Sequence, residues 1–73
     1  MQLATYIRSR RQNIGMTQKQ LAKLVGVTSV TISRWESGQR EPIWSDFVKL
    51  CEVLEMELEW FIREESNYDS KNL

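Results

Sequence analysis

Apolar side chains recur every three to four residues along most of this 73-residue chain, which is the spacing of one face of an α-helix. The first such stretch contains Leu3, Tyr6, Ile7 and Ile14 and ends near Gly15. Three further stretches begin at Thr17, Thr28 and Trp44, and their expected buried positions are Leu21, Ala22, Leu24, Val25, Ile32, Trp35, Trp44, Phe47, Leu50, Cys51 and Leu54. A short fifth helix is expected at 58–62. No stretch alternates with the period of two that is typical of a strand, so the pattern predicts an all-α domain.

The second and third stretches are divided by residues that start and stop helices. The capping residues are Thr17 with Gln20, which match a Thr-x-x-Gln capping box, then Gly26 at a helix end and Thr28 at a helix start. Two helices joined by so short a turn pack closely only where the contact residues are small. Ala22 is small, Gly26 permits the sharp turn, and Ile32 points back to the core. This spacing predicts a central helix-turn-helix unit.

The composition is that of one folded domain. Hydrophobic residues make up 41% of the chain and charged residues 27%, a balance that disordered chains lack. We expect a compact five-helix bundle over residues 1–65 and a flexible tail over 66–73. No apolar run approaches the length of a membrane span or of a signal peptide, so a cytoplasmic protein without a membrane partner is expected.

Side chains for metal or catalytic chemistry are scarce. Cys51 is the single cysteine and the chain has no histidine, so neither an internal disulfide nor a Cys/His zinc site can form. A serine or cysteine hydrolase would also lack its histidine base. The sequence therefore predicts no metal, no cofactor and no enzymatic activity.

The charges are separated along the chain although their sum is zero. Residues 1–40 contain seven basic residues against one acidic residue, a net charge of +6, and residues 41–73 contain three against nine, a net charge of −6. Such a layout presents a basic surface to nucleic-acid phosphates and an acidic surface that phosphates repel. The alternative interpretation is that both sets of charges only keep the surface soluble.

The segment TQKQLAKLVGVTSVTISRWESGQREP resembles the helix-turn-helix of the phage Cro and repressor proteins, the Xre family. The resemblance extends from about Ile7 to Ile62 and implies a lambda-repressor-like DNA-binding domain. In this family the helix that here covers 28–37 enters the DNA major groove. The implied function is a transcriptional regulator, Cro-like, a small repressor or a restriction-modification controller, that binds a palindromic double-stranded DNA operator as a homodimer.

The resemblance also implies roles for individual residues. The expected base contacts are Ser29, Val30, Arg34 and Ser33, and the expected phosphate contacts are Gln18, Lys19, Thr28, Thr31, Gln39, Arg40 and Arg11. The guanidinium of Arg34 matches guanine O6 and N7, and Val30 matches a thymine methyl group. The alternatives are that Val30 is partly core and that Arg34 is only a solvated charge. Arg11 and Glu36 match an ion pair of relatives, which gives Arg11 a structural role instead of, or besides, a phosphate contact.

The dimer interface is expected in the last predicted helix, where the apolar cluster comprises Leu58, Trp60, Phe61 and Ile62. The alternative is that this cluster closes the core of its own chain. The sequence departs from its relatives at Ser29, where many have Gln, and at Glu55 and Glu57, where Gly and Ser or Thr are common. A rival function is an antitoxin, a module that binds a toxin or another regulatory protein and binds DNA secondarily.

Overall fold

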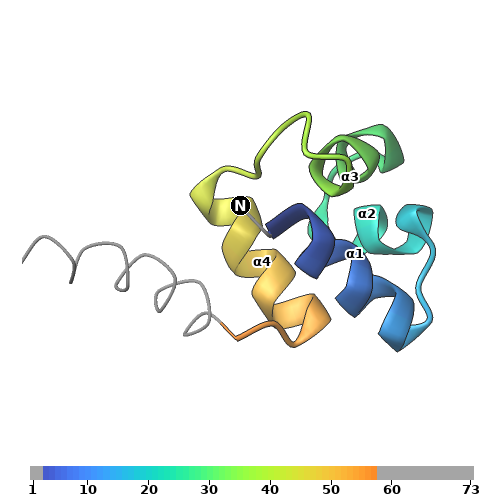
Figure 1. The fold of residues 1–73 in the computed structure, drawn as a ribbon. Helices are drawn as coiled ribbons and strands as arrows, with labels where there is room; N and C mark the ends of the chain where they lie inside the picture. The colour runs from blue at the N-terminus through green and yellow to red at the C-terminus, as the bar shows by residue number, and fades with distance from the viewer. Residues whose placement is uncertain (1–2, 58–73) are drawn as a thin grey trace, which may run out of the picture.

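The computed structural model describes residues 3–57, which form four helices and no strand. These are α1 (Leu3–Ile14), α2 (Gln18–Val25), α3 (Ser29–Glu36) and α4 (Trp44–Leu54). The helices α1 and α2 each pack against both α3 and α4, which lie apart in Figure 1, α3 at the top and α4 at the left. The all-α prediction is confirmed over this range. The fifth helix expected at 58–62 lies outside the described residues, and so does the tail expected at 66–73.

The predicted caps define the start of α2 and the turn between α2 and α3. Thr17 Oγ1 accepts from the backbone N–H of Gln20 at 3.0 Å, and Gln20 Oε1 accepts from the backbone N–H of Thr17 at 2.8 Å, which completes the capping box. Gly26 ends α2 in the left-handed conformation with φ of 87°, and its N–H donates to the carbonyl of Ala22. Thr28 begins α3 by accepting from the N–H of Thr31. The helix-turn-helix prediction from local sequence is therefore confirmed.

Each helix contributes one face to a single core. The buried side chains are Leu3, Ile7, Leu21, Ala22, Val25, Ile32, Trp35, Phe47, Leu50, Leu54 and Met56. Ile32 is fully buried and Trp35 is 4% exposed, so α3 is held from behind by two large apolar side chains. Burying an aliphatic or aromatic side chain of this size stabilises a domain by about 1.5–3 kcal/mol. The opposite face of α3 thus remains free for another role.

Two residues expected in the core are exposed instead. Leu24 is 57% exposed because it lies about 80° around α2 from the centre of the face that Leu21 and Val25 form. Trp44 is 62% exposed because it is the first residue of α4, at the end of that helix's buried stripe. Its ring packs only at a tilt against Phe47, with the ring centroids 5.8 Å apart. The prediction that these two side chains are buried was wrong.

The turn after α4 forms without a glycine. Glu55 adopts the left-handed conformation with φ of 54°, and its N–H donates to the carbonyl of Cys51. Met56 follows and is 6% exposed, although the sequence pattern gave it no role. Burial and the carboxylate of Glu52 raise the pKa of the Cys51 thiol, so this thiol is protonated at neutral pH.

Glu55→Gly is expected to raise the free energy of unfolding by about 0.5–1 kcal/mol. The left-handed conformation costs a residue with a side chain about 1–2 kcal/mol of free energy. Glycine avoids this cost, and the extra backbone entropy that it loses on folding costs only about 0.5–1 kcal/mol. Urea denaturation of both proteins measures the difference. The control is Glu52→Gly in the interior of α4, which should lower stability by about 1 kcal/mol. A loss of stability in Glu55→Gly would show that this turn is unstrained.

None of the helices within residues 3–57 is long and apolar enough to cross a membrane.

Candidate nucleic-acid interface

The outer face of α3 is polar, exposed and open to a ligand. Ser29, Ser33 and Arg34 are exposed, and Val30 is 56% exposed, so Val30 is not a core residue. Within residues 3–57, the Arg34 guanidinium makes no hydrogen bond or ion pair, although its backbone carbonyl accepts from the Ser37 hydroxyl. The four residues expected to contact bases therefore share the surface of α3 that the core does not use.

The start of α3 is fixed by two threonines. The hydroxyl oxygens of Thr28 and Thr31 are 3.1 Å apart and form a hydrogen bond, and Thr28 Oγ1 also accepts from the Thr31 N–H at 3.2 Å. Thr28 is exposed and Thr31 is half-buried. The first turn of α3 is thus rigid before any ligand is bound, and both hydroxyls lie beside its exposed face.

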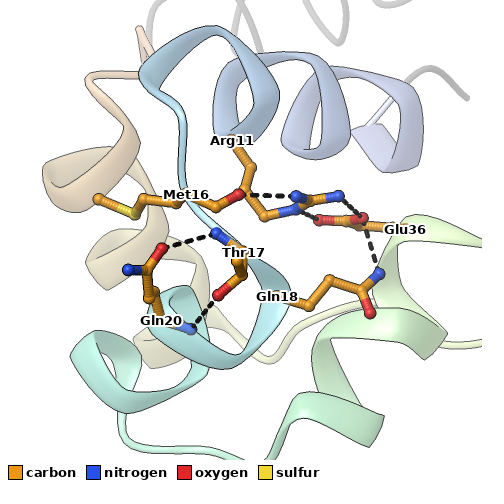
Figure 2. Close-up of polar contacts among 6 residues, drawn as sticks. All are labelled: Arg11, Met16, Thr17, Gln18, Gln20 and Glu36. Carbon is orange, nitrogen blue, oxygen red and sulfur yellow. Dashed lines mark hydrogen bonds and ion pairs between the residues drawn. The ribbon is translucent and has the colours of Figure 1, made fainter.

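Arg11 and Glu36 form an ion pair that joins α1 to the last residue of α3 (Figure 2). Arg11 Nε donates to Glu36 Oε2 at 2.6 Å, and Arg11 Nη2 donates to Glu36 Oε1 at 2.9 Å. The side chains are 11% and 4% exposed, so the pair is shielded from solvent. Arg11 Nη1 also donates to the carbonyl of Met16, just before α2, at 2.8 Å. One guanidinium thereby fixes the positions of three helices.

The carboxylate of Glu36 raises the pKa of Arg11 further above its ordinary value, chiefly through the hydrogen bond between the two groups. A raised pKa in the folded state means that the contact with the ionised Glu36 carboxylate stabilises the fold below the ordinary arginine value. At high pH this contribution is lost as the pH rises through the raised value. Arg11 is therefore charged under all physiological conditions.

Gln18 belongs to the same network, which the sequence did not indicate. Its Nε2 donates to Glu36 Oε1 at 3.1 Å, so the side chain expected to contact phosphate is already directed toward α3 (Figure 2). The two residues are 18 positions apart, and no local pattern relates them. A second hydrogen on Nε2 and the backbone N–H at the start of α2 remain as donors for a phosphate.

A hollow of about 240 Å³ adjoins this network on one side of α3. It is lined by Arg8, Arg11, Gln18, Ser33, Glu36 and Ser37. Arg8 is exposed and was not among the expected site residues, although it lies three positions before Arg11 and therefore on the same face of α1. That spacing is the signal that identifies it. Arginine, amide and hydroxyl donors thus surround a space next to the exposed face of α3.

A second hollow of about 300 Å³ lies on the other side of α3 and is lined by Thr31, Arg34, Trp35, Arg40, Glu41, Ile43 and Asp46. Arg40 belongs to the loop after α3, and its N–H donates to the carbonyl of Arg34 at 3.3 Å. Gln39 in the same loop and Lys19 on α2 are exposed. The residues expected to contact phosphate therefore flank α3 rather than gather at one point.

The charge separation in the sequence corresponds to a separation between helices. All seven basic residues of the chain's first 40 positions lie on α1, α2, α3 and the loop after α3. Residues 41–57 contain one basic residue, Lys49, and five carboxylates. The exposed face of α3 thus belongs to the basic part, and the excess of carboxylates lies in residues 41–57, of which Glu41 and Asp46 line the hollow beside Arg34. The residues expected in a dimer interface, Leu58, Trp60, Phe61 and Ile62, lie outside the described residues.

Comparison with known proteins gives a consistent result. A helix-turn-helix family profile matches residues 7–61. The chain is 38% identical over 56 residues to the HTH-type transcriptional regulator DicA of Escherichia coli K12, covering 77% of this chain and 42% of DicA. It is 33% identical over 57 residues to repressor protein C2 of Salmonella phage P22, covering 78% of this chain and 26% of C2. It therefore spans less than half the length of either relative.

Two further similarities bear on function. The chain is 35% identical over 57 residues to the antitoxin HipB of Escherichia coli K12, covering 78% of this chain and 65% of HipB. Its structure is similar to that of the P22 c2 repressor in complex with a synthetic operator, with a TM-score of 0.73 and 34% sequence identity. That similarity covers 75% of this chain and 83% of the repressor chain.

Proposed function

This chain belongs to the helix-turn-helix family, and we propose that it is a transcriptional regulator that binds a double-stranded DNA operator in a sequence-specific manner. The resemblance to the Cro and repressor proteins is confirmed by this membership and by the relatives above. The observation that carries the proposal is the exposed face of α3, whose Arg34 guanidinium has no partner within residues 3–57. We call α3 the recognition helix from here on.

The roles proposed on the recognition helix follow from the chemistry of its side chains. The planar fork of Arg34 fits guanine O6 and N7 with two parallel hydrogen bonds. Val30 offers a branched apolar surface to a thymine methyl group. The hydroxyls of Ser29 and Ser33 both donate and accept, and the short Ser29 side chain leaves readout to fewer direct contacts or to a bridging water.

Contacts to phosphate would hold the recognition helix in the groove. The proposed contacts are Gln18, Lys19, Thr28, Thr31, Gln39, Arg40 and, with its remaining donors, Arg11. Arg11 and Gln18 line the hollow on one side of the recognition helix, and Arg40 lines the hollow on the other, as the strands of DNA flank the major groove. They position the protein and read no sequence.

A homodimer completes the proposal. One recognition helix reads about half a turn of DNA, and two-fold dimers read half-sites about 34–36 Å apart. The apolar residues Leu58, Trp60, Phe61 and Ile62 are the proposed contact between the two copies. The P22 c2 repressor, which this fold resembles, was solved in complex with an operator.

Selection of bound duplexes from random DNA, followed by sequencing, tests this function. We expect two copies of one short sequence in inverted orientation, with their centres about one helical turn apart. Enrichment of no sequence would refute the proposal.

The similarity to HipB supports an antitoxin as the second candidate, which would co-purify with a second protein chain.

Affinity for the selected operator is expected to fall steeply with salt. Each phosphate that a lysine or arginine neutralises releases counterions, so the logarithm of affinity should decrease against the logarithm of salt concentration with a slope of about −0.9 per contact. Fluorescence anisotropy at several salt concentrations measures this slope. A slope near zero would contradict the role given to the basic residues around the recognition helix.

A further inference from the structure

The hollow of about 240 Å³ that adjoins the ion pair of Arg11 and Glu36 contains one cation that the fold does not use. Arg8 lies on α1, is exposed, and is part of the lining of this hollow. Within residues 3–57 its guanidinium makes no hydrogen bond or ion pair. The charge of Arg8 is therefore available to a ligand that enters the hollow.

The second arginine of this hollow is already balanced by a carboxylate. Arg11 donates to Glu36 at 2.6 and 2.9 Å, and the two side chains are 11% and 4% exposed. A negative group in the hollow is attracted by this guanidinium and repelled by the adjacent carboxylate over nearly the same distance, so the two Coulomb energies largely cancel. Two arginines and one glutamate line the hollow, and two minus one gives a net charge of +1. This excess charge is that of Arg8.

Arg11 acts instead on the shape of the hollow. Its guanidinium donates to Glu36 and to the carbonyl of Met16, and it thereby joins α1 to the start of α2 and the end of the recognition helix (Figure 2). Gln18 Nε2 donates to the same carboxylate, which leaves the second hydrogen of this amide as a donor. The walls of the hollow are thus held by contacts that exist before a ligand binds, and Arg8 lies about one turn away along α1.

The ligand that these groups fit is a phosphate of the DNA backbone. A guanidinium binds phosphate oxygens with two parallel hydrogen bonds, and the amide of Gln18 donates in the same direction. The volume of about 240 Å³ is many times the roughly 10–15 Å³ that one water requires, so a phosphate group fits. Ser33, on the exposed face of the recognition helix, is part of the lining. A duplex that holds this helix in its major groove therefore brings its backbone past the hollow.

We infer that Arg8 supplies the charge that binds one backbone phosphate in this hollow, and that Arg11 is a positioning residue there. This inference rests on the proposed function and adds Arg8 to the residues that contact phosphate. The alternative is that Arg8 is a solvated surface charge. In that case its removal affects DNA binding no more than the removal of any other exposed cation.

Arg8→Met is expected to reduce the magnitude of the salt slope by about 0.9, because one phosphate fewer is neutralised. Its loss of affinity for the selected operator should therefore be about threefold larger at about 50 mM salt than at about 200 mM. Fluorescence anisotropy measures both quantities. Arg8→Lys retains the charge and should retain the slope.

The control for charge alone is Lys49→Met. Lys49 is exposed on α4 and lines neither hollow beside the recognition helix, so its substitution removes the same charge and should leave the salt slope unchanged. Thermal unfolding establishes that each variant is folded at the assay temperature. Equal slopes in the wild type and Arg8→Met would overturn the inference, and so would equal reductions in Arg8→Met and Lys49→Met.

A double variant, Arg11→Met with Glu36→Leu, separates the roles of the two arginines. It removes both members of the balanced pair and leaves the net charge of the hollow at +1, so it should keep the salt slope even where its affinity falls. A purely structural role of Arg8 would not produce this difference in slope between the variants. A slope reduced as much as in Arg8→Met would assign the phosphate to Arg11 and overturn the inference.

Duplexes in which one phosphate at a time is replaced by an uncharged methylphosphonate locate the contact. Among the phosphates that the wild type requires, one in each half-site should become indifferent to replacement in Arg8→Met, because its partner charge is already absent. Additive losses at every position would overturn the inference. A wild type that binds no duplex refutes the proposed function and this inference with it, whereas a wild type that selects an operator and shows additive losses overturns only the inference.

Discussion

Arg11→Met is expected to lower the free energy of unfolding by about 3 kcal/mol, and to lower the melting temperature of this small domain by about 10–20 °C. The Glu36 side chain is 4% exposed in the wild type, and the substitution leaves its carboxylate one hydrogen bond, from Gln18, in place of three. Breaking a buried ion pair costs about 3–5 kcal/mol, because the remaining charge is desolvated without compensation. The lower value applies because the hollow beside the pair admits water.

The control for this prediction is Arg8→Met. Arg8 lies on the same helix and loses the same charge, but it is exposed, so its substitution should change stability by less than about 0.5 kcal/mol. A double variant, Arg11→Met with Glu36→Leu, should recover much of the loss, because apolar pairs often replace buried ion pairs at little cost. Urea denaturation of the four proteins measures all of these differences. Equal stabilities of Arg11→Met and Arg8→Met would mean that the pair is no stronger than a surface contact.

The sequence predicted where the helices begin and end at the helix-turn-helix. A helix cap depends on residues only three or four positions apart, so the caps were predicted correctly. They are formed by Thr17 with Gln20, by Gly26 and by Thr28. Buried positions in the middle of helices were also predictable, as Ile32 shows. A fixed period identifies one face of a helix wherever neighbours cover that face along its whole length.

The burial of side chains at the margin of the core could not be predicted from the sequence. Leu24 and Trp44 are apolar and fall near the buried stripes of their helices, yet no neighbouring helix within residues 3–57 covers them. Met56 lies in a turn, where no period applies, and it is buried because Glu55 turns the backbone toward the core. Whether a side chain at a margin is covered depends on the packing of the whole bundle, which a single helix does not encode.

The polar contacts across helices show the same division. The family resemblance predicted the ion pair between Arg11 and Glu36. The hydrogen bonds from Gln18 to Glu36 and from Arg10 to the carbonyl of Leu54 were found only in the structure. An ion pair between two helices consists of one acidic and one basic side chain, and two such residues can be recognised as possible partners in the sequence. A bond from a side chain to a backbone carbonyl has no such signature, because every residue has a carbonyl.

Arg34→Ala is expected to cost about 1–3 kcal/mol of binding free energy on the preferred operator and to abolish discrimination at one base pair in each half-site. The guanidinium is exposed and has no partner within residues 3–57, so its removal leaves no buried group unpaired and should not destabilise the fold. Competition between the operator and its single-base variants measures discrimination separately from total affinity. Loss of affinity with unchanged discrimination would assign Arg34 to phosphate.

Two matched substitutions separate base contact from charge. Arg34→Lys retains the charge but lacks the planar fork, so it should lose most of the discrimination and keep the salt dependence. Arg40→Ala, in the loop beside the recognition helix, should instead weaken binding to all sequences about equally and reduce the magnitude of the salt slope by about 1. If Arg34→Lys discriminates as well as the wild type, a point charge is sufficient at this position.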